Sequence, residues 1–451
     1  MDLTGKQVLV AGLGKSGIAA GALLKKLGCS VFLFDENKKF DTAAWKKTYP
    51  VFSDCPLWVG ELPDEAVDKM ELAVVSPGIP LDSLAMQKIY NVGIPIWGES
   101  ELAYRLAKGR VAAITGTNGK TTTTTLVGEI LKKCYPEVFV VGNIGIPYTS
   151  IVEKTTEQTI AVAEISSFQL ETADKFKPKA AAILNLTPDH LDRHGDMAGY
   201  LAAKAKIFAA QDENDYLILN YDDEYLRPLA AQARGQVLFF SRKHILESGV
   251  YVHDDIVCAA FKDETIEICR AEEIMIKGAH NLENAMAAAA LCLVMGLKVD
   301  IIAKVLKTFP GVEHRLEPVR TLNGVLYVND SNGTHTDSTA KALEAYDRPL
   351  VLIAGGKGKG VSFLPLAELI KKRVKAVVLV GMAKYELKEA LDQAGFSNYV
   401  LVDTFEQTVP AAQKIAQAGD IVLLSPACTS WDMFNSYEER GELFKKLVNA
   451  L

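Results

Sequence analysis

The chain has 451 residues, of which 49% are hydrophobic and 23% charged, a composition typical of a globular protein long enough for about three domains. Its net charge of −7 excludes a broadly basic surface for nucleic acid, so anionic ligands must be held by local lysines, arginines and helix N-termini. Seven cysteines without a CxxC pair favour a reduced, cytoplasmic protein over a disulfide framework.

The first third of the chain, residues 1–95, has the pattern of a nucleotide-binding βαβ unit. It enters a strand at residues 7–11 without a basic leader, so we expect no signal peptide. A glycine-rich turn, GLGKSG at 12–17, precedes an alanine-rich helix, and the next strand ends at Asp35. The glycines let the backbone approach a diphosphate, and Asp35 is placed to accept hydrogen bonds from a sugar or a base.

A second ligand-binding turn is predicted further along the same sheet edge. The strand at residues 72–75 ends in SPGIP, which either contacts a ligand or forms a rigid proline–glycine loop. Taken alone, the GLGKSG turn suits a dinucleotide oxidoreductase. Residues 1–95 offer no nicotinamide-type proton donor, however, and a phosphate-binding loop follows downstream, so a nucleotide-sugar is favoured over a redox cofactor.

Residues 111–125, VAAITGTNGKTTTTT, predict the phosphate-binding element around which the chain is organised. A buried strand leads into a turn with two glycines, and Lys120 and Thr121 then open a helix. Backbone N–H groups at the helix start point at phosphate oxygens, Lys120 adds a positive charge, and Thr121 offers a hydroxyl to Mg²⁺. The spacing departs from the strict Walker pattern, because the first glycine of that pattern would fall at Ile114.

The middle region, residues 96–311, places a carboxylate beside this loop. The strand at 159–165 ends at Glu164, which either holds Mg²⁺ or caps a helix. The metal role is favoured for Glu164, and helix capping is assigned to Ser166 and Ser167.

A dense polar turn follows the next strand, at residues 180–186. Within its Asp/His/Asp cluster, His190 either ligates a metal or takes a proton from an incoming amine, whereas His194 is expected to be structural. The following helix carries Lys204 and Lys206, and the residues alone give no reason to prefer either.

A small β-rich insert is predicted at about 215–276, and no chemistry is assigned to it. The run GAHNLEN then opens an alanine-rich helix, in which Asn281 and Asn284 share one face and either read an adenine edge or cap the helix. The apolar stretch at 285–295 is too short to cross a bilayer and predicts a buried helix.

The last third, residues 312–451, alternates strands and helices again and predicts a third parallel α/β layer. It begins with a hinge and a charged latch that ends at Arg315, and an early strand closes at Asp330. Two loops, GGKGKG and SPACTS, carry Lys359 and Ser430. Each loop alone is equally well a plain strand–helix connection, but together they suit an acidic substrate.

A series of motifs stands in order over nearly the whole chain: TGTNGKTT, VGNIG, EISSFQLE, NLTPDHLDRHG, GAHNLENAMAA, HRLE, VNDS and SPACTSWDMF. In this combination the chain resembles the Mur ligases, and EISSFQLE and SPACTSWDMF are most similar to the D-glutamate-adding branch. The resemblance implies an α/β fold of three domains. These are a Rossmann-like UDP-sugar-binding domain (1–95), a central P-loop ATPase with a parallel sheet and a small β insert (96–311), and a C-terminal Rossmann-like domain (312–451).

The resemblance also implies the reaction. ATP phosphorylates the carboxylate of UDP-N-acetylmuramoyl-L-alanine (UDP-MurNAc-L-alanine), the amine of D-glutamate attacks the acyl phosphate, and a tetrahedral intermediate collapses to the peptide bond, ADP and phosphate. Such an enzyme makes a peptidoglycan precursor in the cytoplasm with ATP and two Mg²⁺ ions. Its expected partners are these small molecules, with no nucleic acid and no membrane, and a monomer is expected.

The resemblance assigns the site residues one by one. For ATP it implies Gly116, Thr117, Asn118, Gly119, Lys120, Thr121, Thr122, Asn281, Asn284, Arg315 and Asp330. For the UDP-sugar it implies Gly14, Lys15, Ser16, Asp35, Ser76 and Gly78, and for D-glutamate it implies Lys359, Ser430 and Tyr437. For metal it implies Thr121, Glu164, His190 and Lys204, with Lys204 carboxylated by CO₂. The catalytic set is Lys120, Asn143, His190 and Lys204.

One departure from the family pattern follows VNDS. The family usually continues with a lysine, a small residue, a threonine and an asparagine, whereas this chain has Asn332-Gly333-Thr334-His335. His335 or Lys357 is a candidate to replace the missing lysine. The alternatives to the D-glutamate ligase are another amino-acid-adding Mur ligase, a folylpolyglutamate synthetase, or a nucleotide-binding regulator without ligase activity; a dehydrogenase is least favoured.

Overall fold

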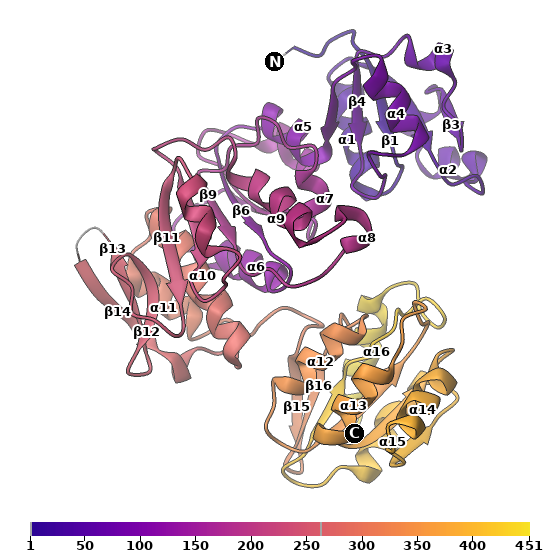
Figure 1. The fold of residues 1–451 in the computed structure, drawn as a ribbon. Helices are drawn as coiled ribbons and strands as arrows, with labels where there is room; N and C mark the ends of the chain where they lie inside the picture. The colour runs from indigo at the N-terminus through magenta and orange to yellow at the C-terminus, as the bar shows by residue number, and fades with distance from the viewer. Residues whose placement is uncertain (1, 262–263) are drawn as a thin grey trace. The chain divides into compact units, whose positions relative to one another are not determined.

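The computed structural model describes residues 2–261 and 264–451, which form two compact units (Figure 1). The first unit runs to Ile274 and includes His280–Thr308, and the second comprises Met275–Ala279 and Phe309–Leu451. The predicted α/β architecture is confirmed, with three separate sheets along the chain. All seven cysteines are free thiols. None of the helices in the described residues has the length and apolar character needed to cross a lipid bilayer.

The N-terminal sheet consists of five parallel strands in the order β3-β2-β1-β4-β5. Because the strand order reverses between β1 and β4, the loops after these two strands lie next to each other at the carboxyl edge. They are the GLGKSG turn and the SPGIP turn. The elements are β1 (Gln7–Ala11), α1 (Lys15–Lys26), β2 (Ser30–Asp35), α2 (Thr42–Thr48), β3 (Leu57–Val59), α3 (Asp64–Val67), β4 (Leu72–Val75), α4 (Leu84–Asn91) and β5 (Ile96–Gly98).

Helix α5 (Glu99–Leu106) follows β5 directly and attaches the N-terminal sheet to the middle of the chain. Its first turn buries two carboxylates. Glu99 accepts hydrogen bonds from the backbone N–H (2.6 Å) and the hydroxyl (2.8 Å) of Thr149, and burial raises its pKa. Glu101 accepts hydrogen bonds from the backbone N–H groups of residues 174–176. Two buried carboxylates that accept hydrogen bonds from fixed donors therefore join the first turn of α5 to the central region.

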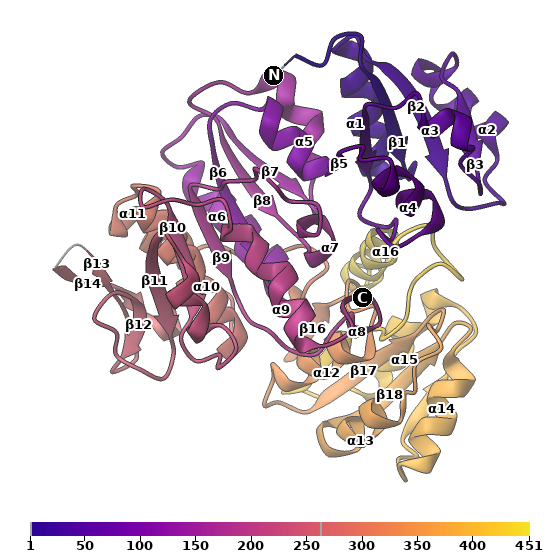
Figure 2. The same cartoon turned by 45° about the horizontal axis from the view of Figure 1, so that its top comes forward.

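The central sheet has nine strands in the order β14-β13-β12-β11-β10-β9-β6-β8-β7, and Figure 2 shows them side by side. Neighbouring strands are parallel from β7 to β12, and β12, β13 and β14 pair antiparallel. The predicted β insert thus extends this same sheet. The strands are β6 (Arg110–Thr115), β7 (Val138–Gly142), β8 (Ile160–Glu164), β9 (Ala180–Ile183), β10 (Tyr216–Asn220), β11 (Gln236–Ser241), β12 (Gly249–His253), β13 (Ile256–Phe261) and β14 (Glu264–Arg270).

The helices of this region connect the strands and cover the sheet. Ile114 on β6 is in register with Glu164 on β8, so the phosphate-loop strand and the strand with the carboxylate end at the same edge. The predicted apolar helix is confirmed, because residues 285–293 are buried in α10. The helices are α6 (Lys120–Leu131), α7 (Ser167–Leu170), α8 (Leu191–His194), α9 (Met197–Ala205), α10 (Ala279–Val294) and α11 (Val299–Leu306).

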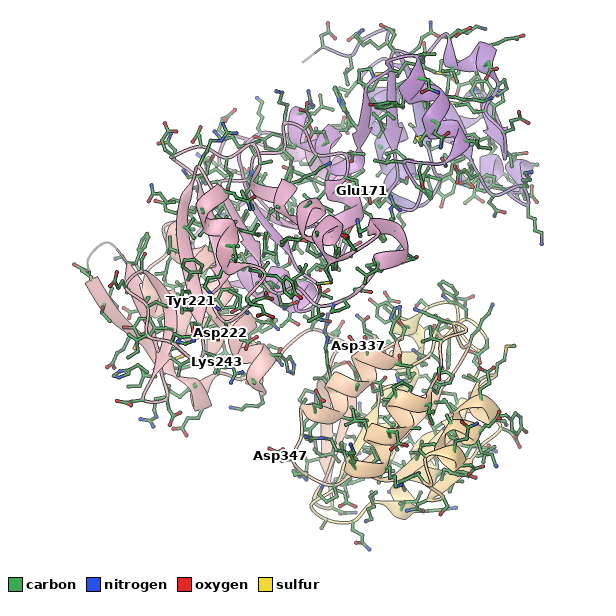
Figure 3. The ribbon with its side chains drawn as sticks, in the orientation of Figure 1. Glu171, Tyr221, Asp222, Lys243, Asp337 and Asp347 are labelled. Atoms are coloured by element: carbon green, nitrogen blue, oxygen red, sulfur yellow. The ribbon has the colours of Figure 1, made fainter. Side chains whose placement is uncertain are left out.

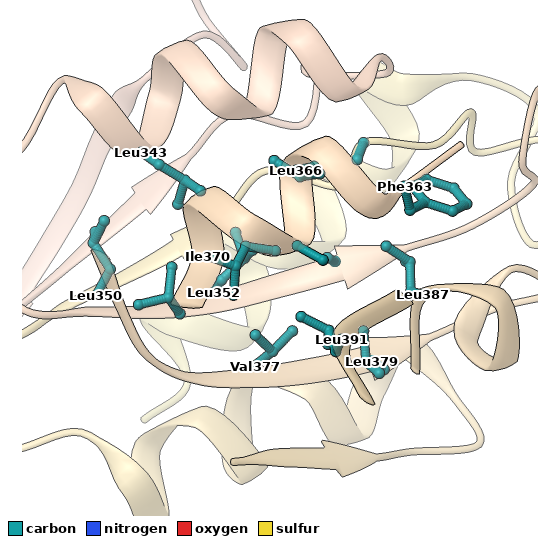
Figure 4. Packing of buried hydrophobic residues seen from close by; sticks show 14 of the residues in the cluster. Leu343, Leu350, Leu352, Phe363, Leu366, Ile370, Val377, Leu379, Leu387 and Leu391 are labelled. Atoms are coloured by element: carbon teal, nitrogen blue, oxygen red, sulfur yellow. The ribbon is translucent and has the colours of Figure 1, made fainter. Parts of the chain in front are cut away.

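The second unit contains a six-stranded sheet in the order β15-β16-β20-β17-β18-β19, parallel except for β15. Figure 4 shows its core, in which Leu352 and Val377 of the sheet pack against Leu343, Ile370 and Leu391 of three helices. The elements are β15 (Glu317–Leu322), β16 (Val325–Asn329), α12 (Thr336–Glu344), β17 (Leu350–Gly355), α13 (Leu364–Arg373), β18 (Val374–Val380), α14 (Lys384–Gln393), β19 (Tyr399–Leu401), α15 (Thr408–Ile415), β20 (Ile421–Leu424) and α16 (Tyr437–Asn449).

Candidate active site

The predicted phosphate-binding loop connects β6 to α6. Gly116 and Gly119 have φ values of 151° and 82°, which favour glycine. A Cβ atom at Gly119 would lie 2.1 Å from the side-chain oxygen of Asn284. On the other side, Asn185 accepts a hydrogen bond from the Asn118 N–H (2.8 Å) and donates one to the Asn118 carbonyl (3.1 Å). The loop is thereby held against the start of α6, where backbone N–H groups attract phosphate.

Two lysines meet at one carbonyl oxygen of this loop. Lys120 donates to the carbonyls of Gly116 (2.9 Å) and Thr117 (2.8 Å), and Lys204 donates to the same Gly116 carbonyl (2.9 Å). Lys204 is 1% exposed, and its burial, followed by the positive charge of Lys120, lowers its pKa to about 6. Lys204 is therefore a neutral amine at pH 7.5, whereas Lys206 is exposed. Burial separates two lysines that the sequence could not distinguish.

Glu164 is the acceptor for two predicted site residues. Its Oε2 accepts a hydrogen bond from the Thr121 hydroxyl (2.9 Å), and its Oε1 accepts one from the Asn143 amide (2.8 Å). Glu164 is buried at the end of β8. The predicted capping role is confirmed for Ser166, whose hydroxyl accepts from the Gln169 N–H in a capping box, but it is wrong for Ser167, which is the first residue of α7. Glu164 is thus left to face the phosphate loop.

The hydroxyl of Thr121 and the carboxylate of Glu164 are hard oxygen donors of the kind that Mg²⁺ prefers. In residues 2–261 and 264–451, no group of three His, Cys, Asp or Glu side chains forms a complete metal site. This donor set fits Mg²⁺, which usually takes one or two protein ligands and completes its octahedron with substrate phosphates and water.

The turn after β9 brings His190 to this region. The negative charges of Asp189 and Glu164 act on the Lys204 amine, as does the positive charge of Lys120. The amine is thus surrounded by residues that follow or end three strands, β6, β8 and β9. His190 is exposed, has a positive φ of 53°, and lies 3.5 Å from the Asp189 carboxylate through its Nε2. Its ring packs against that of Phe168, with 4.8 Å between ring centroids.

His194 occupies a different environment from His190. Its Nε2 lies 3.0 Å from the Ser167 hydroxyl, and burial lowers its pKa. The ring also packs between Phe168 and Tyr200. These contacts are consistent with the predicted structural role.

The two asparagines predicted for the ATP site, Asn281 and Asn284, are also adjacent. Asn284 donates to the Asn281 side chain (3.2 Å) from the first turns of α10, and Asn284 is buried beside Gly119. Thr122 is buried in the first turn of α6. The Thr117 hydroxyl accepts a hydrogen bond from the Thr187 N–H (3.1 Å), which links the loop to the His190 turn.

The N-terminal glycine turn is shaped by two of its predicted ligand-binding residues. Asp35 accepts hydrogen bonds from the backbone N–H groups of Leu13 (3.0 Å) and Asn37 (3.0 Å), and Ser76 donates its hydroxyl to the Gly12 carbonyl (2.7 Å). Their first identifiable role is therefore to hold the turn. Gly14 is the N-cap of α1, Lys15 and Ser16 form its first turn, and Gly78 is exposed in the SPGIP turn.

A shallow pocket lies where the SPGIP turn meets α7 and α8. Its polar lining includes Ser76, Gln169, Glu171 and Arg193. Gln169 also donates to the Ser100 hydroxyl (3.2 Å) at the start of α5. The sequence did not single out Gln169 or Arg193, because Ser100, which Gln169 contacts, and Pro77 and Ile79, which Arg193 contacts, lie far away along the chain.

In the second unit, Asp330 is a buried acid at the end of β16. It accepts hydrogen bonds from the Ser425 hydroxyl (2.6 Å) and from the Leu316 N–H (3.2 Å). Burial raises its pKa to about 6, and the positive charge of Arg315 opposes this shift. Arg315 lies between His314 and Leu316, both of which have positive φ values. The two predicted residues of this unit thus act on each other electrostatically.

The remaining predicted residues of the second unit lie on neighbouring loops. The Lys357 and Thr429 backbones exchange two hydrogen bonds (2.9 and 3.1 Å), so the GGKGKG and SPACTS loops run side by side. Ser430 is buried, Tyr437 begins α16, and the Lys359 ammonium lies 2.5 Å from His335 Nε2. His335 therefore contacts the predicted substrate-binding lysine.

A fully buried arginine, which no sequence pattern singled out, ties these loops together. Arg440 donates to the hydroxyl (3.0 Å) and the carbonyl (2.8 Å) of Ser331 and to the carbonyl of Cys428 (3.2 Å). Burial lowers its pKa to about 10. It fixes VNDS against SPACTS from within α16.

Comparison with protein families matches three models along the chain. Residues 6–98 match the MurD-like N-terminal domain of Mur ligases, residues 114–292 the Mur ligase middle domain, and residues 314–428 the Mur ligase glutamate ligase domain.

Similar proteins extend over the full length. A protein of Caldicellulosiruptor bescii named UDP-N-acetylmuramoylalanine–D-glutamate ligase is 49% identical over 453 residues, covering 100% of this chain and 99% of its own. One of the same name from Clostridioides difficile is 45% identical, covering 100% of both chains. The MurF ligase of Thermotoga maritima in complex with ADP, 18% identical, has a similar fold, with a TM-score of 0.58 and coverage of 99% and 96%.

Proposed function

The chain belongs to the Mur ligase family, and from that premise we propose that it is an ATP-dependent ligase that joins D-glutamate to UDP-MurNAc-L-alanine in peptidoglycan precursor synthesis. The observation that carries the proposal is the phosphate loop, with Lys120 and Thr121 at the start of α6 and Glu164 bonded to Thr121. It occurs in a chain 49% identical to a ligase of that name. In this assignment residues 1–95 bind the UDP-sugar, 96–311 bind ATP and 312–451 bind the amino acid.

The triphosphate is assigned to residues 116–122. Backbone N–H groups at the start of α6 donate to its oxygens, and Lys120 exchanges its carbonyl partners for phosphate oxygens. Asn281 and Asn284 are assigned to the adenine edge. Because Asn284 also packs on Gly119, a base bound there is linked directly to the shape of the phosphate loop.

Thr121 and Glu164 are the proposed protein ligands of one Mg²⁺ ion, and His190 and a carboxylated Lys204 those of a second. When bound, these ions offset the negative charge of the triphosphate and of the substrate carboxylate. The structure supports the Lys204 assignment through its lowered pKa, because only a neutral amine attacks CO₂. The amine nitrogen bonds to the carbon of CO₂ and releases a proton, which converts a cationic side chain into an anionic oxygen ligand.

The ligation proceeds in two steps on this scaffold. A carboxylate oxygen of UDP-MurNAc-L-alanine attacks the γ-phosphorus, and ADP leaves. The amine of D-glutamate then attacks the acyl carbon, and phosphate leaves with the bonding electron pair. Lys120 stabilises the charge on the transferred group, and Asn143 orients the reacting carboxylate from its position beside Glu164.

The other substrate contacts are proposed from the family pattern. The UDP-sugar is assigned to the two turns of the N-terminal sheet, at Gly14, Lys15, Ser16, Asp35, Ser76 and Gly78. In the second unit, Arg315 and Asp330 are assigned to ATP, and Lys359, Ser430 and Tyr437 to D-glutamate. Since His335 contacts Lys359, it is the better candidate than Lys357 to offset the missing lysine after VNDS.

The decisive experiment is phosphate release from ATP with UDP-MurNAc-L-alanine and a panel of amino acids. We expect phosphate release with D-glutamate and with none of the other amino acids. Lys120→Met should abolish it, whereas Lys133→Met, which changes an exposed lysine just beyond the same helix, should not. Turnover only with another amino acid and its UDP-precursor, or with a folate and glutamate, would identify a different ligase of the superfamily. ATP binding without turnover on any substrate set would indicate a regulator.

A further inference from the structure

Arg193 in α8 connects the SPGIP turn of the N-terminal sheet to the helix that follows His190. Its Nη1 donates to the Pro77 carbonyl (3.0 Å) and its Nη2 to the Ile79 carbonyl (3.3 Å), on either side of Gly78. We propose that Arg193 is a positioning residue that holds this turn in the shape that receives the UDP-sugar and couples it to the His190 side of the reaction centre. The inference rests on the function proposed above.

The guanidinium group is fixed from its other edge by Glu171, which is labelled in Figure 3. The Arg193 Nε donates to Glu171 Oε1 (2.9 Å) and Nη2 to Oε2 (2.6 Å), a two-point ion pair in which both side chains are 17% exposed. The planar fork thus binds a carboxylate on one edge and two carbonyls on another. A lysine has one nitrogen and cannot satisfy both sides in this geometry.

The Arg193 guanidinium is also linked to His190, the proposed metal ligand, through the Phe168 ring. The Arg193 Cζ lies 4.3 Å from the centroid of the Phe168 ring, and the Phe168 ring packs against His190 at 4.8 Å. Phe168 is thereby held between a cation and the proposed metal ligand. Any movement of Arg193 changes both the carbonyls of the SPGIP turn and the surface on which His190 rests.

Arg193→Lys is the test, and Arg105→Lys is its matched control. Arg105 is equally exposed (17%), pairs with Glu101 and Asp174, and lies 4.2 Å from the centroid of the Trp97 ring. Arg105 therefore shares the carboxylate and aromatic contacts of Arg193, but within the described residues it forms no hydrogen bond or ion pair with the SPGIP turn or with the turn that carries His190. In Arg193→Lys we expect a roughly tenfold higher KM for UDP-MurNAc-L-alanine, equivalent to about 1.4 kcal/mol, and a higher Mg²⁺ concentration for half-maximal activity. KM values for ATP and D-glutamate should change by less than about twofold.

A readout without substrate separates this inference from the proposed function. The Ile79 N–H donates to the Ser76 carbonyl (3.0 Å) within the turn, so its hydrogen exchange reports the turn directly. Exchange should accelerate in Arg193→Lys and not in Arg105→Lys. If the wild type turns over no UDP-MurNAc-L-alanine, the proposed function fails, and Ile79 exchange still decides whether Arg193 holds the turn.

Two results would overturn the inference. One is an unchanged KM for UDP-MurNAc-L-alanine with unchanged Ile79 exchange in folded Arg193→Lys; the other is an equal shift in Arg105→Lys. If Arg193→Lys does not fold, Glu171→Gln replaces it, because it keeps the guanidinium and weakens the ion pair that anchors it. It should shift the same two constants in the same direction by a smaller factor, and an unshifted Glu171→Gln would equally overturn the inference.

Discussion

Replacement of Lys204 by methionine should make the protein more stable at neutral pH, although it removes a proposed ligand. The side chain is buried and its pKa in the folded state is lowered to about 6, against an ordinary value near 10.4 in the unfolded chain. Between these values the unfolded state binds one more proton, so wild-type stability rises with pH, by about 1.4 kcal/mol per unit. At pH 7.5 the cost of keeping this amine neutral is therefore on the order of 4 kcal/mol.

Methionine avoids that cost and loses the hydrogen bond to the Gly116 carbonyl, worth about 1 kcal/mol, and the contact of the amine with the Tyr200 ring. We expect Lys204→Met to unfold at higher urea than the wild type at pH 7, with the difference shrinking at pH 8 and again at pH 9. The assay is urea unfolding in CO₂-free, Mg²⁺-free buffer. Lys206→Met is the control, since this neighbour is exposed, and it should change the midpoint little at any of the three pH values. A Lys204→Met variant that is less stable than the wild type by the same amount at every pH would refute the reasoning.

The lowered pKa of Lys204 also determines how much of its amine is free to react with CO₂. At pH 7.5 a pKa near 6 leaves Lys204 mostly neutral, whereas an ordinary lysine is almost entirely charged. Lys204→Ala should therefore lose ligase activity and regain part of it with added short-chain carboxylates, which supply the missing oxygen ligand. Full activity of the unsupplemented variant would exclude a metal-ligand role.

Three further substitutions test single contacts. Gly119→Ala should raise the KM for ATP at least tenfold and lower stability by about 1–3 kcal/mol, because its Cβ would collide with Asn284 at a φ of 82°; an unchanged KM in a kinetic assay would contradict this. Thr121→Val, which keeps the shape and removes the hydroxyl, should lower kcat by about 10²-fold and raise the Mg²⁺ requirement, whereas a Mg²⁺ titration identical to the wild type would argue against Thr121 as a ligand. His335→Ala should raise the KM for D-glutamate by about three- to tenfold and leave that for ATP unchanged, since His335 steadies Lys359; equal shifts in both KM values would show a general distortion instead.

The sequence predicted the elements whose signal is local. The strand, glycine turn and helix around Lys120, the cap at Ser166 and the carboxylate at the end of β8 follow from neighbouring residues, and all three are present. The family motifs then supplied the roles. What the sequence could not supply are contacts between distant segments. Asn185 braces the phosphate loop from 67 positions away, and Arg440 is buried among carbonyl groups of two other loops.

The sequence also could not predict which of two similar side chains is buried. Lys204 and Lys206 occupy the same kind of helical context, and only the fold makes one a neutral amine and the other a surface charge. Asp35 and Ser76 were expected to face a ligand, yet their observed bonds are to the turn that carries them. Their contact with a UDP-sugar stays a prediction.

The first turn of α5 sets a rule for recombining such enzymes. Glu99 and Glu101 directly follow the N-terminal sheet, but they accept hydrogen bonds from Thr149 and from residues 174–176 in the central region. A chimera spliced between α5 and β6 would place both carboxylates opposite donors from another parent, whereas a junction just after β5 keeps α5 with Thr149 and residues 174–176. Exchange of the N-terminal sheet between homologues should therefore leave α5 together with the segments that hold its first turn.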